Sequence, residues 1–338
     1  MKNAAHCLAF VLAFSVAGAG IRAENHPVTS PAPAWPPPPD NARVIYIRSF
    51  SRPADVGITG SALKRISSWI TGTETAGHNL ASPVGVAVDE AGGVCLADSA
   101  AKKVTYYDVA AKQWQQWDRA GGIAFNTPVA VAKRGGTIFV ADAALAEVIA
   151  FDTGGKLLFQ INHDLERPCG LALLGERLYV TDVAGHCVTA FDMQGKRLLR
   201  FGRRGTGPGE FNYPTHAAAD TRGHLLVTDA LNSRVQVFDA EGRFQAEIGS
   251  AGDTSGHFGR PKGVAVDSFG HVYVADAVFD NIQVFDLSGR LLLNLGGSGP
   301  GPGQFGLPNG IAISRDNHIY VADSCNHRVQ EFQYIGQP

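Results

Sequence analysis

The same short pattern recurs six times between residues 83 and 332, and this recurrence restricts the chain to repeat architectures. Each copy begins at a proline and places an aspartate 14 or 15 residues later. The prolines lie 40 to 47 residues apart and are Pro83, Pro128, Pro168, Pro214, Pro261 and Pro308; the aspartates are Asp98, Asp142, Asp182, Asp229, Asp276 and Asp323. A period of this length indicates one supersecondary unit that packs mainly against its neighbours.

Each copy has the composition of a small sheet. In the fifth copy, short runs rich in β-branched and aromatic residues occupy positions 263–267, 272–276, 281–286 and 291–295. Gly and Asp turn signals separate them, which predicts a four-stranded antiparallel meander. Both faces of such a sheet are apolar, so each sheet needs a neighbour on either side. The sequence therefore predicts an all-β fold, a six-bladed β-propeller of four-stranded antiparallel blades spanning residues 42–335.

The ends of the repeat region indicate how the ring closes. The sixth copy supplies only three strands and ends at Phe332, while Val44–Phe50 (VIYIRSF) reads as a strand without a blade. We predict that this N-terminal strand pairs with the strand around residues 329–332 and completes the last blade. Residues 62–70 (ALKRISSWI) have helical spacing and predict a short helix packed on one end of the ring.

The N-terminal region predicts export. Residues 1–23 combine Lys2, an apolar run from Cys7 to Gly20 and small residues, the pattern of a secretory signal peptide. The run is short for a membrane span. We expect a periplasmic or extracellular protein without an integral membrane span after cleavage, with retention as an anchor left open. Residues 24–41 are proline-rich and predict an extended linker outside the core.

Four cysteines remain after the signal peptide, at irregular and wide spacing. We expect most of them to be buried apolar side chains, with any disulfide pairing left open. They are Cys95, Cys169, Cys187 and Cys325.

The charge balance argues against a nucleic-acid partner. The formal net charge is −2, from 29 Lys and Arg against 31 Asp and Glu. Affinity for nucleic acid needs clustered cations, and the sequence has no basic stripe interleaved with aromatic residues.

The fifth copy and the loop after it, residues 261–308, resemble the NHL repeat. The resemblance lies in Pro-x-Gly-hydrophobic-Ala-hydrophobic, the Tyr-Val-Ala-Asp strand, the Arg-Val-Gln-hydrophobic-Phe strand of neighbouring copies and the Gly-Pro-Gly-x-Phe loop. It extends over residues 83–333 and is most specific in the last three copies. It implies the six-bladed fold and a binding platform, since members of the family bind RNA or protein. A more distant six-bladed relative, the peptidyl-hydroxyglycine amidating lyase, implies a metal-dependent enzyme as the alternative.

His216 is the most informative candidate for a functional residue. It occupies the position that is glycine in four other copies, Gly85, Gly170, Gly263 and Gly310. The innermost strand of each blade begins here, so we predict that His216 points toward the mouth of the central channel, near Lys262 and Asn309. An imidazole at that place suits a metal ligand or a general base, and a single hydrogen-bonded rim histidine is the alternative.

The same rim is predicted to carry further polar residues in its loops, namely Asn232, Arg203, Arg204, Arg260 and His327. The arginines favour an anionic ligand over a cationic one. Arg234 and Arg328 recur at one repeat position and predict salt bridges between blades.

Two other features read as structural. The glycine-rich segments 202–211 and 296–305 lack the Lys-Ser/Thr of a phosphate-binding loop, so they predict connections between blades. The six aspartates lie at equivalent places around a ring, where they predict caps for turns rather than a carboxylate cluster.

Together these features predict a monomeric, non-catalytic binding or scaffolding module for a protein, a peptide or a cell-envelope component. We expect no catalytic residue, bound metal or cofactor. The alternative from another class is a metal-dependent lyase or hydrolase with its site in the central channel.

Overall fold

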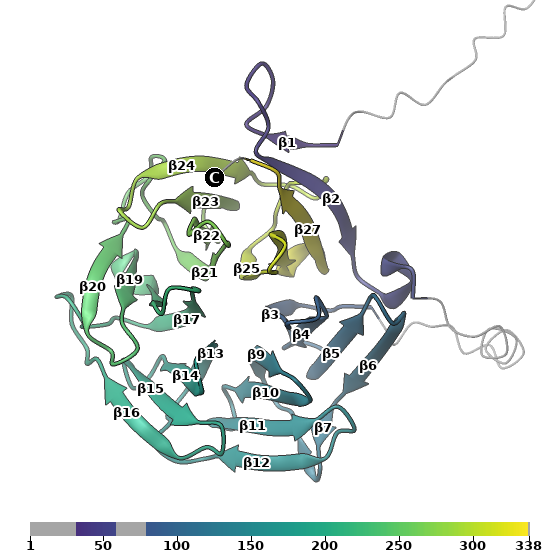
Figure 1. The fold of residues 1–338 in the computed structure, drawn as a ribbon, viewed down its shortest axis with the longest axis vertical. Coiled ribbons are helices and arrows are strands. Elements are labelled where there is room, and N and C mark those ends of the chain that lie inside the picture. Colours follow the sequence, from purple (N-terminus) through teal and green to yellow (C-terminus); the bar gives the residue numbers. More distant parts are fainter. Residues whose placement is uncertain (1–31, 59–78, 337–338) are drawn as a thin grey trace, which may run out of the picture. The chain divides into compact units, whose positions relative to one another are not determined.

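The computed structural model describes residues 32–58 and 79–336, which form a ring of small sheets (Figure 1). The predicted signal peptide, residues 1–23, and the predicted helix, residues 62–70, lie outside the described residues. No helix in the described part of the chain has the length and apolar character needed to cross a membrane.

The first three blades follow one another along the chain, each with its first strand innermost. The first blade contains β3 (Pro83–Val88), β4 (Val94–Asp98), β5 (Lys103–Asp108) and β6 (Gln113–Trp117). The second contains β9 (Pro128–Arg134), β10 (Thr137–Asp142), β11 (Glu147–Asp152) and β12 (Leu157–Ile161). The third contains β13 (Pro168–Leu174), β14 (Arg177–Asp182), β15 (Cys187–Asp192) and β16 (Arg197–Phe201). A two-stranded sheet, β7 (Arg119–Ala120) and β8 (Ile123–Ala124), precedes the second blade.

The remaining blades repeat the same order. The fourth contains β17 (Pro214–Ala219), β18 (Leu225–Asp229), β19 (Arg234–Phe238) and β20 (Phe244–Ile248). The fifth contains β21 (Pro261–Val266), β22 (Val272–Asp276), β23 (Asn281–Phe285) and β24 (Leu291–Gly296). The sixth contains β25 (Pro308–Ile313), β26 (His318–Asp323), β27 (Arg328–Tyr334) and the N-terminal β2 (Val44–Phe50). Short 3₁₀ turns are η1 (Pro53–Val56), η2 (Ala230–Asn232) and η3 (Ser324–Asn326).

The N-terminal strand closes the ring as predicted. β2 pairs antiparallel with β27 from Val44 opposite Tyr334 to Phe50 opposite Val329. Val44 and Phe50 are buried, so the strand is part of the core and not an edge decoration. The six repeats therefore form six four-stranded antiparallel blades, and the last blade joins the two ends of the described chain.

The proline-rich segment is not wholly outside the fold. The sequence predicts a linker over residues 24–41, but β1 (Ala34–Trp35) pairs with β2 and extends the sixth sheet by one short strand. The Trp35 ring lies 5.8 Å from the ring of Phe332, in an edge-to-face contact. The Trp35 ring buries apolar area against the last blade. The proline-rich composition of the segment as a whole gives no sign of this single contact.

The apolar core consists of six clusters, each lying between two neighbouring blades. One example joins Val104 of β5 with Val140 of β10 and Ile149 of β11. The same arrangement recurs around the ring, and β2 contributes Val44 and Phe50 to the clusters on either side of the last blade. Each sheet is thus stabilised by both neighbours, as the two apolar faces of the strands require.

The ring has two faces that differ in their connections. One face carries the loops between second and third strands together with the connections from one blade to the next; we call it the inter-blade-loop face. The other carries the tight turns between first and second and between third and fourth strands; we call it the hairpin face.

The six repeated aspartates organise the inter-blade-loop face, which confirms their prediction as caps. Each carboxylate accepts backbone N–H groups from the loop that leads into its own blade; Asp276, for example, accepts from Gly259 at 2.7 Å and Arg260 at 3.1 Å. The same contact recurs at Asp98, Asp142, Asp182, Asp229 and Asp323. All six are buried.

The glycine-rich segments are connections between blades, as predicted. Residues 202–211 join β16 to β17, and residues 296–305 join β24 to β25. Arg328 pairs with Asp323 of its own blade at 2.8 Å and donates to the carbonyls of Gly301 and Gln304. Arg234 makes the equivalent contacts with Asp229 and the 202–211 loop. The predicted salt bridges between blades are therefore wrong: the ion pairs lie within a blade, and carbonyl groups make the contact to the connection.

The four cysteines of the described residues are all unpaired. Cys95 and Cys187 are buried, as expected for apolar side chains, whereas Cys169 is half-buried and Cys325 is exposed.

Candidate functional site

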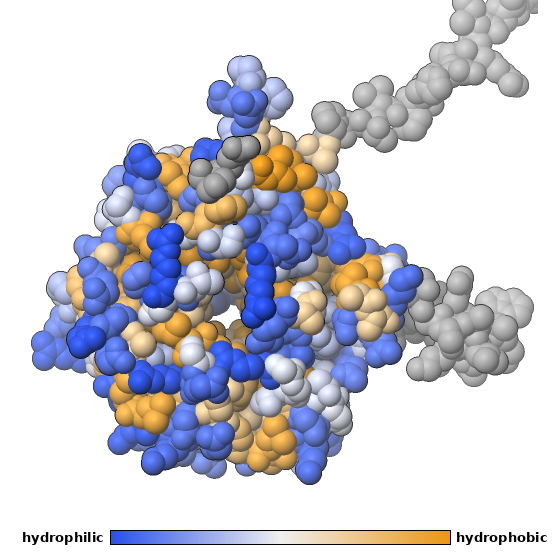
Figure 2. All heavy atoms as spheres, in the orientation of Figure 1, coloured by the Kyte–Doolittle hydropathy of each residue, from blue (hydrophilic) through white to orange (hydrophobic). Residues whose placement is uncertain are grey.

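The innermost strands of the six blades line a central channel, and Figure 2 shows the ring open at its centre. In every inner strand the register shifts by one residue just after the proline. The residue after the proline is partly exposed in all six blades. These residues open the inner strands at the inter-blade-loop face, and we call them the first layer: Val84, Val129, Cys169, Thr215, Lys262 and Asn309.

The second layer consists of glycine in four blades because the inner strands nearly touch. A Cβ atom on Gly85 would lie 2.7 Å from the carbonyl oxygen of Val129, and one on Gly263 would lie 2.3 Å from that of Asn309. Ala130 and His216 are the two residues with side chains in this layer. His216 thus places the one polar side chain of the layer beside the channel.

His216 lies in the channel, where the sequence predicts it. It lines a narrow cavity of about 30 Å³ together with the glycines of the same layer and the aliphatic layer behind them. Its Nδ1 is buried and has no hydrogen-bond partner. Burial, aided by the charge of Lys262, lowers the pKa of His216 to about 3, so the imidazole is neutral at physiological pH.

Lys262 lies close to His216 on the neighbouring inner strand. Burial and the nearby charge of Arg260 lower the pKa of the Lys262 ammonium. On β13, which flanks β17 on its other side, burial raises the pKa of the Cys169 thiol to about 11, although the charges of Arg167 and Lys262 act in the opposite direction. Cys169 is therefore a protonated thiol and not a nucleophile at neutral pH.

Three of the predicted rim residues are occupied in holding loops. Asn232 donates to the carbonyl of Gly205 and to Asp229, and Arg203 pairs with Glu210 inside the 202–211 connection. His327 hydrogen-bonds the carbonyl of Ala81 and so joins the sixth blade to the first. Arg204 and Arg260 have exposed side chains. The structure brings His216 and Lys262 together and places the loop residues farther out on the same face.

The inter-blade-loop face also carries exposed apolar side chains, which the sequence did not single out. They follow the loops of blades four to six, where they are 43–58% exposed, and we call them the apolar arc: Tyr213, Leu231, Val278 and Leu307. Tyr213 and Leu307 immediately precede a repeat proline, whereas Leu231 and Val278 lie two residues after a capping aspartate. At that second position blades one to three carry alanine, so comparison of the repeats would have revealed part of the arc.

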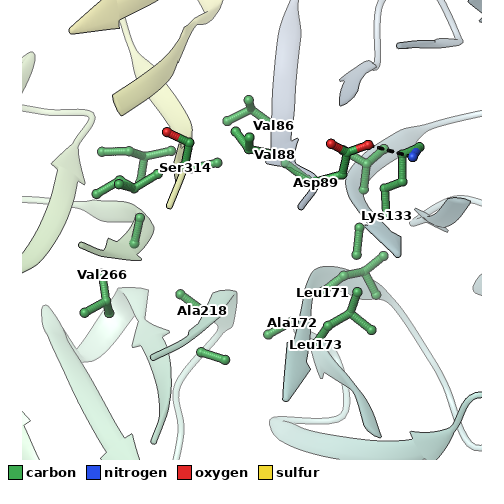
Figure 3. A pocket seen from close by; sticks show the side chains of 18 of the residues that line it. Val86, Val88, Asp89, Lys133, Leu171, Ala172, Leu173, Ala218, Val266 and Ser314 are labelled. Atoms are coloured by element: carbon green, nitrogen blue, oxygen red, sulfur yellow. Dashed lines mark hydrogen bonds and ion pairs between the residues drawn. The ribbon is translucent and has the colours of Figure 1, made fainter. Parts of the chain in front are cut away.

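A larger cavity of about 340 Å³ opens at the hairpin face (Figure 3). Its wall is aliphatic, with Val88, Leu173 and Val266 among the lining residues, and none of the predicted site residues lines it. At its edge the Lys133 ammonium lies 2.6 Å from Asp89. Burial would raise the pKa of Asp89, but hydrogen bonds from Lys133 and Tyr106 lower it below its usual value. When the six repeats are aligned, the position of Lys133 is aliphatic in the other five. This exception is the sequence signal that would have singled out Lys133.

Within residues 32–58 and 79–336, no three or more His, Cys, Asp or Glu side chains gather in a way that could hold a metal ion.

These features define the class of the molecule as a β-propeller of six four-stranded blades whose ring is closed by an N-terminal strand. Residues 211–238 and 305–332, in the fourth and sixth blades, match the family model of the NHL repeat. The chain is thus a six-bladed propeller that contains NHL repeats.

Solved structures with a similar fold include two lyases. The chain is 12% identical to a streptogramin B lyase, with a TM-score of 0.57 over 75% of this chain and 93% of that one. It is 14% identical to virginiamycin B lyase from Staphylococcus aureus, with a TM-score of 0.56 over 75% and 96% of the two chains. A protein of unknown function from Bacteroides thetaiotaomicron is 16% identical, with a TM-score of 0.58 over 76% and 70%. At such identities the likeness shows the fold alone. A comparison with curated protein sequences finds no match.

Proposed function

We propose that this propeller is an exported, monomeric binding module that engages a protein or peptide through its inter-blade-loop face. The observation that carries the proposal is the apolar arc. Of the eight large hydrophobic side chains that are exposed among the described residues, four lie in the loops of this face. Apolar side chains gathered on one surface are typical of an interaction site.

The loops of this face are held in place before any partner arrives. Buried aspartates cap each loop, and Arg234 and Arg328 fix the connections beside them through carbonyl contacts. A surface that is already ordered loses little conformational freedom on binding, which favours affinity. This argues for recognition by a rigid platform.

The charges on the face indicate the chemistry of the partner. Arg204 and Arg260 are exposed in the connections of the same face, and the half-buried Lys262 begins the inner strand of the fifth blade. Such a surface suits an apolar segment flanked by acidic groups, on a soluble protein or on a component of the cell envelope.

A pair of matched double variants tests the face. Leu231→Ser with Leu307→Ser removes two side chains of the apolar arc, each 51% exposed; Leu158→Ser with Leu198→Ser removes two outer-strand side chains, each 46% exposed. Cross-linked proteins captured from the envelope fraction are compared by mass spectrometry. We expect a partner retained by the wild type and the outer-strand variant and reduced at least fivefold by the arc variant. Equal capture by both variants would refute this face.

Export is tested on the protein recovered from its native host. The predicted signal peptide implies that the mature chain begins after Ala19 or Ala23, which the mass of the intact protein and its N-terminal peptide reveal. A chain that still starts at Met1 and resides in the cytoplasm would contradict export.

A further inference from the structure

The channel mouth on the inter-blade-loop face holds polar groups that no described residue satisfies. The half-buried Lys262 ammonium makes no hydrogen bond or ion pair with another residue of ranges 32–58 and 79–336. Within the same ranges, neither ring nitrogen of His216 is hydrogen-bonded. The hydroxyl of Thr215, one residue earlier, is also buried without a partner. Native proteins rarely leave such groups unpaired, so they require water or a ligand.

These groups belong to one small region. Thr215 and His216 lie on β17, and Lys262 lies on β21, the inner strand packed against it. Lys262 is near enough for its charge to influence the pKa of His216 and that of Cys169, which lies on β13, the inner strand on the other side of β17. Asn309 continues the same layer on β25 and presents a side-chain amide.

The region carries positive charge without an acid to balance it. The first two layers of the channel contain no Asp or Glu. Asp182, which acts on the pKa of Cys169, already accepts the backbone N–H groups of Glu166 and Arg167. Asp276, which lies opposite Pro261 in the register, likewise accepts the backbone N–H groups of Gly259 and Arg260. Both carboxylates are therefore committed to their loops, and the Lys262 ammonium faces a mouth that lacks a counter-ion.

We infer that this mouth is a binding site for a single carboxylate group, held by the ammonium of Lys262 and by hydrogen bonds from Thr215, His216 and Asn309. One ammonium matches one negative charge, and the cavity behind it has room for about one water molecule. A phosphate group, with more charge and more oxygen atoms, would need the guanidinium groups that lie farther out on the rim. The substituent of the carboxylate would point outward, toward the apolar arc.

The carboxylate has two possible sources, a free small carboxylic acid or the C-terminus of a peptide. The second source deepens the proposed function and rests on it, whereas the site itself does not depend on the apolar arc.

The probe for the site is acetate, titrated into the full chain while NMR follows the ring signals of His216, assigned with His216→Gly. We expect a saturable shift that Lys262→Met weakens tenfold or more, because an ion-paired hydrogen bond is lost. Lys262 holds no other described residue, so this variant is expected to fold. Lys196→Met, which removes an exposed lysine on the hairpin face, should bind acetate as the wild type does. Absence of saturation, equal binding by Lys262→Met, or an equal response to chloride or phosphate would overturn the site.

The source is distinguished with acetyl-Ala-Leu-Ala as the free acid and as the amide. Tighter binding of the free acid than of acetate supports a peptide C-terminus, and equal binding supports a small acid. Equal binding of free acid and amide would contradict carboxylate recognition. The Leu231→Ser, Leu307→Ser variant separates the two proposals. If this variant loses the protein partner but still binds acetate, the proposed function and the carboxylate site are both supported. If the wild type binds acetate but no partner depends on the apolar arc, the carboxylate site stands and only the proposed function fails.

Discussion

Single buried residues decide how firmly the inter-blade-loop face is held. Asp323 is fully buried, and it receives the side chain of Arg328, which is 14% exposed, together with the backbone N–H of Gly306. Arg328 also donates to three carbonyls of the preceding connection, so one guanidinium joins a capping carboxylate to the loop that it caps.

Replacing Arg328 with methionine should destabilise the protein by about 2–4 kcal/mol, because a buried carboxylate loses its ion pair and three carbonyls lose a donor. The matched control is Arg290→Met, which breaks the pair with Asp286 where the arginine is 76% exposed. Such exposed pairs contribute about 0–1 kcal/mol. Urea unfolding of both variants measures the difference; similar losses would contradict a special contribution from Arg328.

His216 should make stability depend on pH. Burial lowers its pKa to about 3 in the folded state, against about 6.5 in the unfolded chain. Between these values the unfolded state binds a proton that the folded state excludes, so the free energy of unfolding falls as the pH drops below about 6.5.

His216→Gly should remove that dependence. Relative to this variant, the wild type should lose up to about 1 kcal/mol per pH unit between pH 6.5 and pH 4. At pH 7 the variant should be at least as stable as the wild type, because glycine occupies this place in four other blades and the unpaired Nδ1 disappears. Parallel curves of unfolding free energy against pH for the two proteins would refute the buried, neutral imidazole.

Some of the site was predictable at this scale and some was not. The glycine column of the repeats exposes His216 as an exception, and its position after the proline predicts the channel. The orphaned hydroxyl of Thr215 was not predictable, because it depends on the register shift that follows each proline. The apolar arc was missed because the exposure of a side chain in a loop depends on how the neighbouring loops pack. The repeating pattern of strands carries no information about that packing.

At the scale of elements, β2 determines whether the last blade is complete. The strand buries Val44 and Phe50, and its Arg48 pairs with the buried Glu331 of β27 at 2.6 Å. Its position could be predicted from sequence because the sixth repeat lacks a fourth strand and the N-terminal region has one strand that belongs to no repeat. The attachment of Trp35 escaped prediction, since nothing in a proline-rich segment distinguishes a ring that packs from one that does not.

Removing residues 24–50 should therefore lower the thermal midpoint by about 10 °C or more and promote aggregation, because β27 becomes an exposed, apolar edge. Removing residues 24–31, which leaves β1 and β2 in place, should change little. Differential scanning calorimetry and light scattering of the two truncations make the comparison. If both behave alike, β2 does not hold the ring closed.

At the scale of the whole molecule, the propeller presents two dissimilar ends of one channel. The inter-blade-loop face has a narrow polar mouth and an apolar arc, while the hairpin face has a wide aliphatic cavity edged by the Asp89 and Lys133 pair. The six-bladed fold was predictable because the period and the number of repeats specify it. Which end is wide was not, because channel width depends on how far neighbouring inner strands approach each other.

Metal content distinguishes the binding module from the metal-dependent alternative. Protein purified without chelators should contain less than about 0.1 zinc or calcium ion per chain, and EDTA should leave its thermal midpoint unchanged, since metal that binds the native state would stabilise it. A stoichiometric metal, or a midpoint that falls with EDTA and recovers with the ion, would favour a lyase or hydrolase.

The pairing of β2 with β27 also determines how the ring responds to force. The two strands are antiparallel, and Val44 lies opposite Tyr334, so once the short β1 has separated from β2 the two chain ends leave the ladder at the same place. Tension applied to the two termini would load these hydrogen bonds one after another, like a zipper, and not all together in shear. The last blade should therefore open at low force. The pairing of β2 with β27, which closes the ring, is then also its mechanically weakest point.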